Sequence, residues 1–312
     1  MAFDIYTLYA VNIATTAAVD LFIDQIVRQR ISPGIQRILA GGSGSVDPTY
    51  VAVMDQKPTI TFDTTALATV LASCGISGLK IDSDVDDVGA EFWFQKLEEG
   101  GTRATGANHR KMTVNEGLLV PVEIRAPHNG APATLSMSLA ITWDGTNDPI
   151  VLESSQSLTG SPSVGEIFTA GPVMINGAEV EGIQETIIRF GLDVMTIGGS
   201  GSVWPTYAAI RAREPEIVFT TLDASHFATY GFSGTAQGAT DSIVYLRKVA
   251  EGATRVANAT AEHISFTLDE GMVHTQEVGG DHNNPQMPSL IFVPTYDGSN
   301  AIIVVNTATA IA

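Results

Sequence analysis

The sequence is poor in the basic residues that bind nucleic acid and in the cysteines that cross-link a secreted domain. One cysteine, Cys74, stands among 312 residues, so no internal disulfide can form, and the apolar run around it predicts a buried thiol. There are only five lysines, and 16 Lys and Arg against 34 Asp and Glu leave a net charge of −18. Because affinity for DNA comes from cations that contact phosphates, a protein that holds nucleic acid is disfavoured.

A long apolar run and a basic leader are lacking as well. No stretch approaches the roughly 18 consecutive apolar residues of a membrane span, and Met1–Asp4 carries no basic residue. We therefore expect no membrane segment and no signal peptide, and we expect the chain to be made and folded in a cytoplasm.

Charged residues of either sign are scarce and make up 16% of the chain. The surface of a soluble monomer normally carries more mixed charge. One interpretation is simply an acidic, soluble protein. The other is that copies of the chain cover much of one another's surface and leave the acidic residues on what remains exposed.

What the sequence does contain is an internal repeat. Gly41–Tyr50 (GGSGSVDPTY) returns as Gly198–Tyr207 (GGSGSVWPTY). Later matches keep the same order: Lys57–Phe62 with Glu214–Phe219, Gly75–Gly78 with Gly231–Gly234, Gln95–Arg103 with Arg247–Arg255, Thr113–Gly117 with Thr267–Gly271, and Trp143–Asn147 with Tyr296–Asn300. A period of half the chain is far longer than a solenoid repeat, so we expect two tandem, homologous domains, 1–155 and 156–312, each with its own core.

Each copy is predicted to be mostly strand. Val19–Val27 could be written as a helix, but the matching region of the second copy has Asn176-Gly177 between apolar runs, a hairpin signal, so both lead-ins are predicted as strands. Further strands are predicted over Tyr50–Val53, Thr59–Phe62, Ala90–Leu97, Met112–Val114, Leu118–Arg125, Thr134–Trp143 and Pro149–Leu152, and over Ser242–Val249, Ile264–Leu268, Met272–Val278, Ser289–Tyr296 and Ala301–Val305.

One helix per copy interrupts the strands. Asp63–Thr65 is predicted to cap a helix over Thr65–Ser73 that ends at Gly75, and Thr220–Gly231 occupies the same place in the second copy. The expected fold class is therefore all-β: two β-sandwich or barrel domains, each with one flanking α-helix. Glu153–Gly165, rich in Ser, Gly and Pro, is the predicted linker.

The Gly/Ser loops are the first candidates for a site. Successive glycine amides can bind phosphate, but the loops lack the lysine of a P-loop and the second glycine of a nucleophile elbow is misplaced, so structural loops are favoured. We expect them to contact a neighbouring subunit or ring, because glycine-rich loops kept in both copies need partners to order them. The candidate assembly residues are Gly41, Gly42, Ser43, Gly44, Ser45, Gly198, Gly199, Ser200, Gly201 and Ser202, together with Arg103 and Arg255 of the repeated Glu-Gly-x-Thr-Arg motif, since arginine is enriched at interfaces.

No metal or cofactor is expected. Asp82–Asp87 begins like an EF-hand, but its sixth residue is Asp87 rather than glycine and its twelfth is Trp93 rather than glutamate, which favours a solvated acidic loop. The six histidines lack metal-ligand spacing. His128 and His282 recur at matching places, as do His109 and His263, which favours turn or strand-edge roles. Asp144 and Asp297 belong to repeated Asp-Gly turns.

Four motifs recur in both copies in the same order. They are Ile183–Ile187 with its counterpart Asp24–Val27, the Gly/Ser loop ending in Pro-Thr-Tyr, the Pro-x-Ile-x-Phe strand before the helix, and the late Trp/Tyr-Asp-Gly turn. Together they resemble the tail tube (major tail) proteins of long-tailed bacteriophages. The resemblance implies a β-sandwich with one flanking helix and no enzymatic activity.

The resemblance also implies a function in the virion tail. Such proteins form rings that stack into a tube through which the genome passes, and this chain is similar to the duplicated variant, in which three chains supply six domains. Its implied partners are copies of itself and other phage tail proteins, with DNA only as transiting cargo and no membrane. A negatively lined tube suits that role, because it repels phosphate.

Two other classes of function stay open. One is another self-assembling virion protein, such as a head decoration or tail terminator subunit. The other is a tandem carbohydrate-binding module with Trp93, Trp143 and Trp204 as sugar platforms, although aromatics packed in a repeated core or interface explain these residues as well. An enzyme is not expected, because no set of nucleophile, base and orienting residue stands out.

Overall fold

Alternating apolar and polar residues make strands over most of this chain. Along Thr134–Thr142, Leu135, Met137 and Leu139 are buried and the residues between them are half-buried, as in a strand that covers a core with one face. The computed structural model describes residues 4–13, 21–82, 89–101, 103–158, 160, 162–199, 201–237, 242–252, 254–279, 282 and 287–311.

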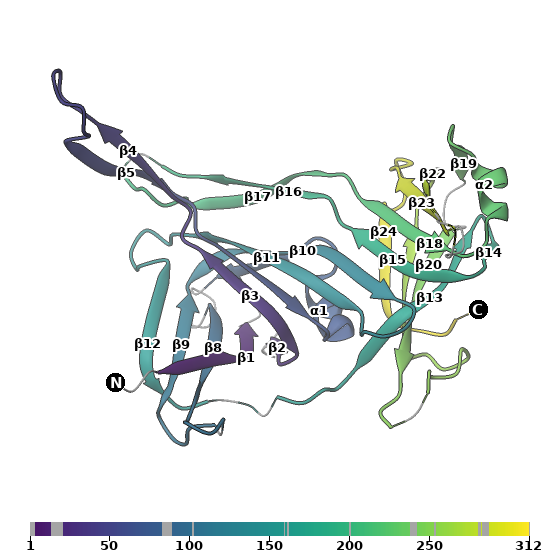
Figure 1. The fold of residues 1–312 in the computed structure, drawn as a ribbon, viewed down its shortest axis with the longest axis horizontal. Coiled ribbons are helices and arrows are strands. Elements are labelled where there is room, and N and C mark those ends of the chain that lie inside the picture. The colour runs from purple at the N-terminus through teal and green to yellow at the C-terminus, as the bar shows by residue number, and fades with distance from the viewer. Residues whose placement is uncertain are drawn as a thin grey trace.

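The elements fall into two series with the same order (Figure 1). The first series is β1 (Ile5–Ile13), β2 (Leu21–Ile23), β3 (Ile26–Ser32), β4 (Ile35–Ala40), β5 (Tyr50–Gln56), β6 (Thr59–Thr64), α1 (Leu67–Cys74), β7 (Leu79–Asp82), β8 (Ala90–Leu97), β9 (His109–Val114), β10 (Glu116–Pro127), β11 (Thr134–Thr142) and β12 (Ile150–Gln156). The second is β13 (Ile167–Ile175), β14 (Ala178–Val180), β15 (Ile183–Arg189), β16 (Leu192–Ile197), β17 (Tyr207–Arg213), β18 (Glu216–Thr221), α2 (Ser225–Tyr230), β19 (Thr235–Gln237), β20 (Ser242–Val249), β21 (His263–Leu268), β22 (Gly271–Gly279), β23 (Met287–Pro294) and β24 (Ile303–Thr309). We call them the first half and the second half.

A long central sheet runs through both halves. Its strands follow the order β19-β22-β23-β18-β15-β10-β11-β6-β3, and β7 pairs with β10 as a tenth strand. Two five-stranded sheets flank it, in the orders β12-β9-β8-β1-β2 and β14-β13-β20-β21-β24. The remaining strands form two hairpins, the first arm (β4–β5) and the second arm (β16–β17).

The pairing pattern of the first half recurs in the second. In the flanking sheets, β1, β2, β8, β9 and β12 of the first half correspond to β13, β14, β20, β21 and β24 of the second half and pair in the same order. In the central sheet, the pairs β3·β6 and β10·β11 correspond to β15·β18 and β22·β23. The halves meet where β10 of the first pairs with β15 of the second. This junction, the seam, makes one sheet out of two similar halves.

The fold class predicted from the sequence is confirmed as all-β, with antiparallel sheets and two short helices in the described part of the chain. The described parts of both lead-ins form strands as predicted, and Ala90–Leu97 and Ser242–Val249 have the predicted limits. Two short strands, β7 and β19, were not predicted. They pair with the starts of β10 and β22.

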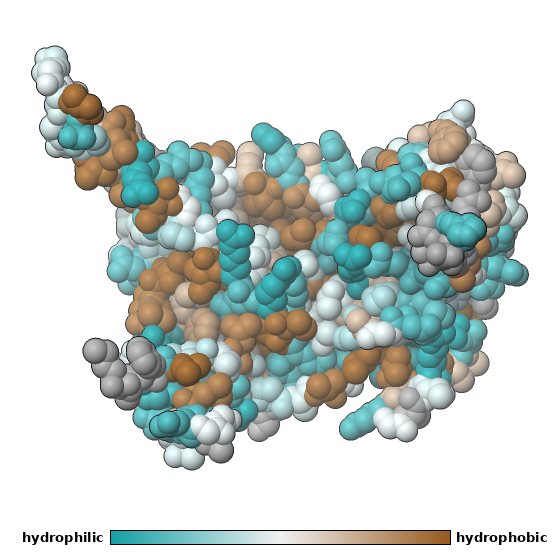
Figure 2. Space-filling model, viewed as in Figure 1, coloured by the Kyte–Doolittle hydropathy of each residue, from teal (hydrophilic) through white to brown (hydrophobic). Residues whose placement is uncertain are grey.

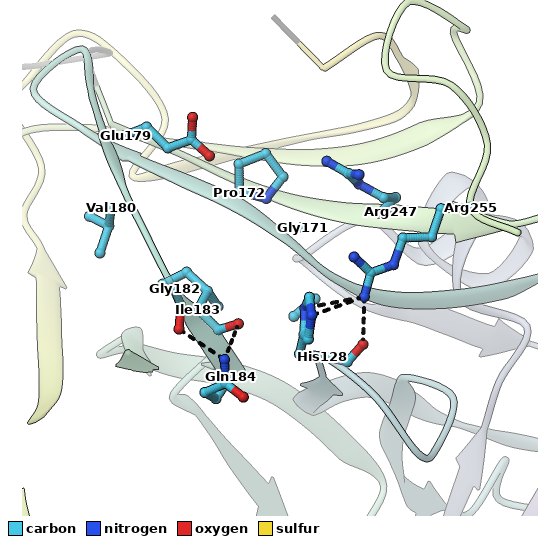
Figure 3. Close-up of a pocket in the computed structure, with 11 residues that line it drawn as sticks. His128, Gly171, Pro172, Glu179, Val180, Gly182, Ile183, Gln184, Arg247 and Arg255 are labelled. Carbon is cyan, nitrogen blue, oxygen red and sulfur yellow. Dashed lines mark hydrogen bonds between the residues drawn. The ribbon is translucent and has the colours of Figure 1, made fainter. Parts of the chain in front are cut away.

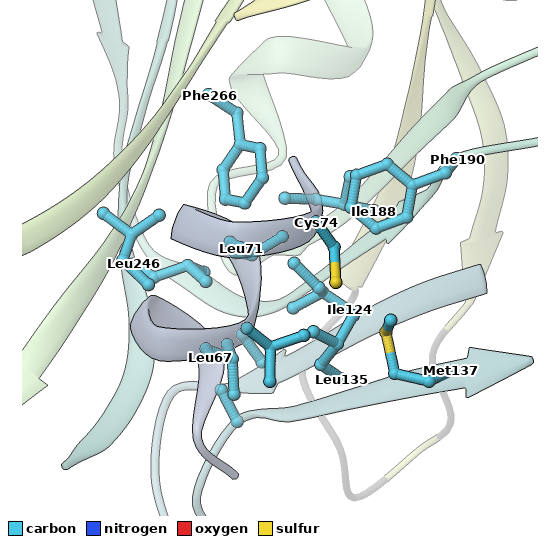
Figure 4. Packing of buried hydrophobic residues seen from close by; sticks show 14 of the residues in the cluster. Leu67, Leu71, Cys74, Ile124, Leu135, Met137, Ile188, Phe190, Leu246 and Phe266 are labelled. Carbon is cyan, nitrogen blue, oxygen red and sulfur yellow. The ribbon is translucent and has the colours of Figure 1, made fainter. Parts of the chain in front are cut away.

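The hydrophobic core does not divide between the halves. One cluster of buried residues contains side chains of both. In Figure 4, Leu67, Leu71 and Cys74 of α1 pack beside Leu246 and Phe266 of the second half. Burial raises the pKa of the Cys74 thiol to about 12, so it behaves as a small apolar side chain. The expected separate cores are joined by α1 into one.

The predicted cap of α1 over Asp63–Thr65 is right only in part: Thr64 Oγ1 accepts from the amide of Ala66 at 3.1 Å, just before the helix, but the helix amides are bonded elsewhere. The helix begins at Leu67, after Ala66, without a capping hydrogen bond from that residue's own side chain. Glu166 Oε1 instead accepts hydrogen bonds from the amides of Ala68 at 2.8 Å and Thr69 at 3.2 Å. Asp63 is engaged in the central sheet, where it accepts a hydrogen bond from Ser136. A carboxylate near a helix N-terminus satisfies amides that lack intrahelical partners, and here it comes from the start of the second half.

The predicted linker is too long. Residues Glu153 to Gln156 belong to β12, which pairs with β9. The ammonium of Lys111 bridges Glu153 at 2.9 Å and Glu91 at 2.8 Å, so Glu153, the first residue of the predicted linker, stabilises a strand. The connection between the halves is the segment from residue 157 to residue 166.

Candidate assembly surfaces

The seam joins the halves by a short antiparallel ladder. Pro127 lies opposite Glu185 at one end and Glu123 opposite Arg189 at the other. Arg125 donates to Glu185 at 2.6 Å, and Arg189 donates to Glu123 at 3.1 Å and also bridges Glu216. On this face of the sheet, charges of opposite sign thus alternate across the seam.

The other face of the seam is apolar. Ile124 and Ala126 of β10 lie opposite Ile188 and Thr186 of β15, and all four are 0% exposed. Burying an isoleucine in this way contributes about 1.5–3 kcal/mol. The seam therefore combines a buried hydrophobic stripe with partly exposed ion pairs, and the stripe supplies most of its stability because exposed pairs contribute little.

Arg255, one of the two predicted interface arginines, spans the seam. Its guanidinium donates to the carbonyl of His128 at 2.9 Å and to Asn129 Oδ1 at 3.3 Å, and it lies 3.2 Å from His128 Nδ1. Arg103 holds the equivalent place in the first half, where Leu97 bridges to Arg103 as Val249 bridges to Arg255. Arg103 contacts its own half, donating to Gln95 at 2.8 Å and lying 4.9 Å from the ring of Tyr9.

A pocket of about 190 Å³ opens beside the Arg255 contact (Figure 3). His128, Arg247 and Arg255 line it, with Glu179 as the carboxylate among the described lining residues. Burial lowers the pKa of His128 below its ordinary 6.5, and the charges of Arg255 and Arg247 lower it further. Burial and Arg255 likewise lower the pKa of Arg247. The lining offers positive charge but no nucleophile, and it belongs to the seam.

The second arm lies across the first half. β16 and β17 pack against β10 and β11. Near the tip, the amide of Gln56 donates to the carbonyl of Val203 at 2.8 Å, and the amide of Trp143 donates to that of Pro205 at 2.8 Å. The predicted assembly loop around Gly198, Gly199, Gly201 and Ser202 thus lies beside the first half, whereas Ser200 lies outside the described residues.

The first arm projects away from the body (Figure 1). Every residue of β4 is exposed, and apolar side chains cover the arm (Figure 2), among them Ile38, Leu39 and Val51. Leu39 is 60% exposed. Scattered exposed apolar residues are ordinary, but a projecting hairpin that carries several of them has the composition of a contact surface.

The loop at the tip of the first arm is a turn. It holds the candidate residues Gly41, Gly42, Ser43, Gly44 and Ser45. The amide of Ser45 donates to the carbonyl of Gly42 at 3.1 Å, Ser45 Oγ donates to Asp47 O at 2.7 Å, and Gly44 has a φ of 90°. No described helix starts after it, so it is not a phosphate-binding loop of the strand-to-helix type. A contact of this loop with another subunit stays a prediction.

A glycine sets the base of each arm. Gly34 has a φ of 57° and Gly191 a φ of 58°. A Cβ on Gly34 would lie 1.9 Å from the carbonyl oxygen of Lys57, and one on Gly191 would lie 1.9 Å from that of Glu214. Both arms therefore leave the central sheet through a turn that only glycine fits.

The remaining candidates have structural positions. His109 and His263 are buried at the starts of β9 and β21, where their Nδ1 atoms accept from the amides of Lys96 at 3.0 Å and Lys248 at 3.1 Å. Asp144 Oδ1 accepts from the amides at positions 146 and 147 (2.7 and 2.8 Å), and Asp297 repeats this geometry. These histidines and aspartates hold strands and turns.

Other predicted features bear on metals and sugars. No group of three or more potential ligands gathers within the described residues, and of Asp82–Asp87 only Asp82 is described. Trp93 is 5% exposed and Tyr245, at the equivalent place, is 4% exposed, so neither offers a ring face to a sugar. No described helix is long and apolar enough to cross a membrane.

Comparison with known proteins adds no family. Neither a protein-family model nor a curated protein sequence matches this chain. The function has to be argued from its own residues.

Proposed function

We propose that this chain is a structural virion protein that assembles with copies of itself into rings, and that the rings stack into a phage tail tube. Three chains per ring would give six similar halves. We propose further that the halves descend from one duplicated domain. The role rests on the four repeated motifs described above, and the self-assembly rests on the architecture.

One observation carries the self-assembly. The halves stand side by side in one continuous sheet, related head to tail. Within the described residues, one end of this sheet is the outer edge of β3, and the other is formed by β19 and the part of β22 that β19 does not cover. A head-to-tail contact that can repeat generates either a closed ring or an open filament. Sheet edges left open are templates for pairing with another chain. Rings of equivalent halves follow if the repeated rotation closes.

The exposed first arm supports assembly independently. Its apolar side chains need a cover, and in a stacked assembly a neighbouring chain would supply it. The predicted negative lining of the tube gains no such support from the central sheet, where the charges are balanced: Arg125 with Glu185, and Arg189 with Glu123. The net charge of −18 has to be carried elsewhere if it faces the lumen.

Negative-stain electron microscopy of the purified chain over a concentration series, combined with light-scattering mass, tests the proposal. Hollow tubes, or rings with the mass of three chains and a sixfold outline, are the expected result. Closed oligomers that never stack would instead favour a head decoration or tail terminator subunit. A monodisperse monomer at every concentration would contradict the proposal.

A further inference from the structure

We propose that one chain joins the next by repeating its internal seam: β22 of one copy pairs with β3 of the next, and the first arm of that next copy lies across β22 and β23. This inference rests on the proposed self-assembly and names the surfaces that carry it. The occupant of both surfaces is a second copy of this chain. The model for the contact is the internal junction, where β10 pairs with β15 and the second arm lies across β10 and β11.

The outer edges of β22 and β3 have the same arrangement of strands as β10 and β15, which pair with each other at the seam. β7 pairs with the first residues of β10 and leaves Glu123–Pro127 for β15. In the second half, β19 pairs with Gly271–Val273 of β22, and among the described residues the later part of β22 has no strand on its outer side. Within the described part of the chain β3 likewise pairs with β6 alone, whereas its counterpart β15 pairs with both β18 and β10.

Equivalent side chains are buried on β15 and exposed on β3, as expected if β3 lacks a covering strand in the single chain. Ile188 of β15 is 0% exposed, because β10 covers it. Ile31 of β3 lies opposite Ile60 as Ile188 lies opposite Ile217, yet Ile31 is 41% exposed. Val278 of β22 is the residue that corresponds to Ile124. Pairing the two edges in the register of the seam would bring Ile31 onto Val278 and rebuild the apolar stripe.

The charges favour this pairing over the others. In the seam register, Glu277 corresponds to Glu123, and Arg28 and Arg30 correspond to Glu185 and Ile187. Glu277 would therefore lie diagonally across from Arg30, within reach of a long side chain. Arg28 pairs with Asp63 of its own chain at 2.8 Å, so the charges that meet in this register are Glu277 of β22 and Arg30 of β3. Head-to-tail contact is therefore attractive, whereas β3 against β3 would bring two copies of Arg30 together.

The arms show the same difference. The second arm is bonded through its tip, with Gln56 and Trp143 as donors. Arg213 and Tyr296 stand at the corresponding places of the second half, and the tip of the first arm offers the carbonyls of Val46 and Pro48 as the second offers those of Val203 and Pro205. Tyr296 is 64% exposed where Trp143 is half-buried. Among the described residues, the tip of the first arm has the same turn but no equivalent bonds from a neighbouring segment.

One bond of the internal seam cannot recur. The amide of Phe190 donates to the carbonyl of Val122 at 3.1 Å, but Pro33 stands where Phe190 does and has no N–H. We therefore expect the contact between chains to be weaker than the seam, as suits a contact that forms only on assembly.

Charge reversal tests the pairing. Glu277→Lys and Arg30→Glu each place like charges across the contact, and each should raise the concentration needed for assembly by about tenfold or more. The double variant Glu277→Lys with Arg30→Glu restores an opposite-charge pair at every contact, so it should assemble at nearly the wild-type concentration. Light scattering and electron microscopy of all four proteins measure this, and unchanged thermal unfolding of the monomers checks the fold.

The outcomes separate the two proposals. If the wild type never assembles, the proposed function fails. If the wild type assembles and both single variants assemble equally well, or if the double variant is not rescued, the β22–β3 pairing fails while the proposed function stands. The matched control is Glu185→Lys: it removes the Arg125 pair inside one chain, so it should lower monomer stability slightly and leave the assembly concentration nearly unchanged.

A cross-link reads the register. A chain with Ile31→Cys and Val278→Cys should form a ladder of disulfide-linked multimers on mild oxidation, seen in a non-reducing gel, because the two residues face each other in the proposed pairing. The buried Cys74 does not contribute. Moving the first cysteine to Val27 should abolish the ladder, and an equally strong ladder from Val27→Cys would overturn the register.

Discussion

The two arms have nearly the same tip sequence and the same hairpin pairing, yet one packs against the protein and the other projects from it. The second arm lies on β10 and β11 and bonds to Gln56 and Trp143. The first arm leaves Leu39 and its neighbours exposed. Because the hairpins are so similar, the difference comes from what stands beside each of them. Equivalent positions in the two halves therefore report the effect of a neighbour on an otherwise similar residue.

The largest contrast is expected at the isoleucines of the seam. Ile188→Ser opens a cavity in a 0% exposed site and should cost about 2–4 kcal/mol of the free energy of unfolding. Ile31→Ser, at the equivalent free edge, should cost less than about 1 kcal/mol in the monomer and yet weaken assembly. Chemical denaturation of the two variants measures the first effect. Equal losses in both would show that β3 is already buried in the isolated chain.

A smaller contrast is expected at the bases of the arms. Gly191→Ala forces a Cβ against the carbonyl oxygen of Glu214 and disfavours the positive φ, which should cost about 1–3 kcal/mol and loosen the second arm from the body. Gly34→Ala has the same clash, with Lys57, but the first arm has less packing to lose, because the bond of Gln56 to Val203 lies at its base. The midpoint temperature of thermal unfolding should therefore fall further for Gly191→Ala than for Gly34→Ala. A larger fall for Gly34→Ala would contradict the projecting position of the first arm.

The cap of α1 gives a contrast of about 1 kcal/mol. Glu166→Ala removes the acceptor of two helix amides, so the free energy of unfolding, measured by circular dichroism, should fall by that amount. Asp4 precedes β1 as Glu166 precedes β13, and it pairs with Lys96 at 2.7 Å on the surface. Asp4→Ala should change stability less, since exposed ion pairs contribute little. A larger effect at Asp4 would show that the bonds to α1 do not stabilise it.

The smallest effect is expected from pH. The pKa of His128 is lowered in the folded chain by burial and by Arg255, so the folded state favours the neutral ring. The stability that this ring contributes is complete above its ordinary pKa of 6.5 and declines as the pH falls below that value, because the unfolded chain then binds the proton more readily. His128→Asn should flatten the decline between pH 7 and about 5. An equally steep decline in His128→Asn and in the wild type would contradict this role of His128.

The sequence predicted well what depends on local pattern. Period-two alternation located strands such as Ala90–Leu97 to the residue, and Asn176-Gly177 revealed the hairpin between β13 and β14. It missed β7 and β19 because three or four residues carry too little pattern. The joined core, to which Leu71 belongs, could not be predicted from the sequence either, because an apolar helix face does not indicate which part of the protein will cover it.

The assembly surfaces show a different limit. Ile31 and Ile188 are the same residue in equivalent strands, so no local rule could distinguish the free edge from the buried one. The cap of α1 comes from Glu166, 98 residues from Ala68, while a nearer carboxylate, Asp63, matched the capping pattern and is used elsewhere. Arg255 was singled out by its repeated motif, but only the coordinates separate its contact across the seam from that of Arg103 within one half.

The dependence of α1 on the second half has a consequence for biosynthesis. The helix takes its cap from residue 166 and packs against β24, which lies more than 200 residues further along the chain than α1 starts. Until β24 has been translated, the core around α1 therefore stays incomplete. In the assembly that we propose, a chain in which β24 has not yet been made would therefore not be ready to join its neighbours.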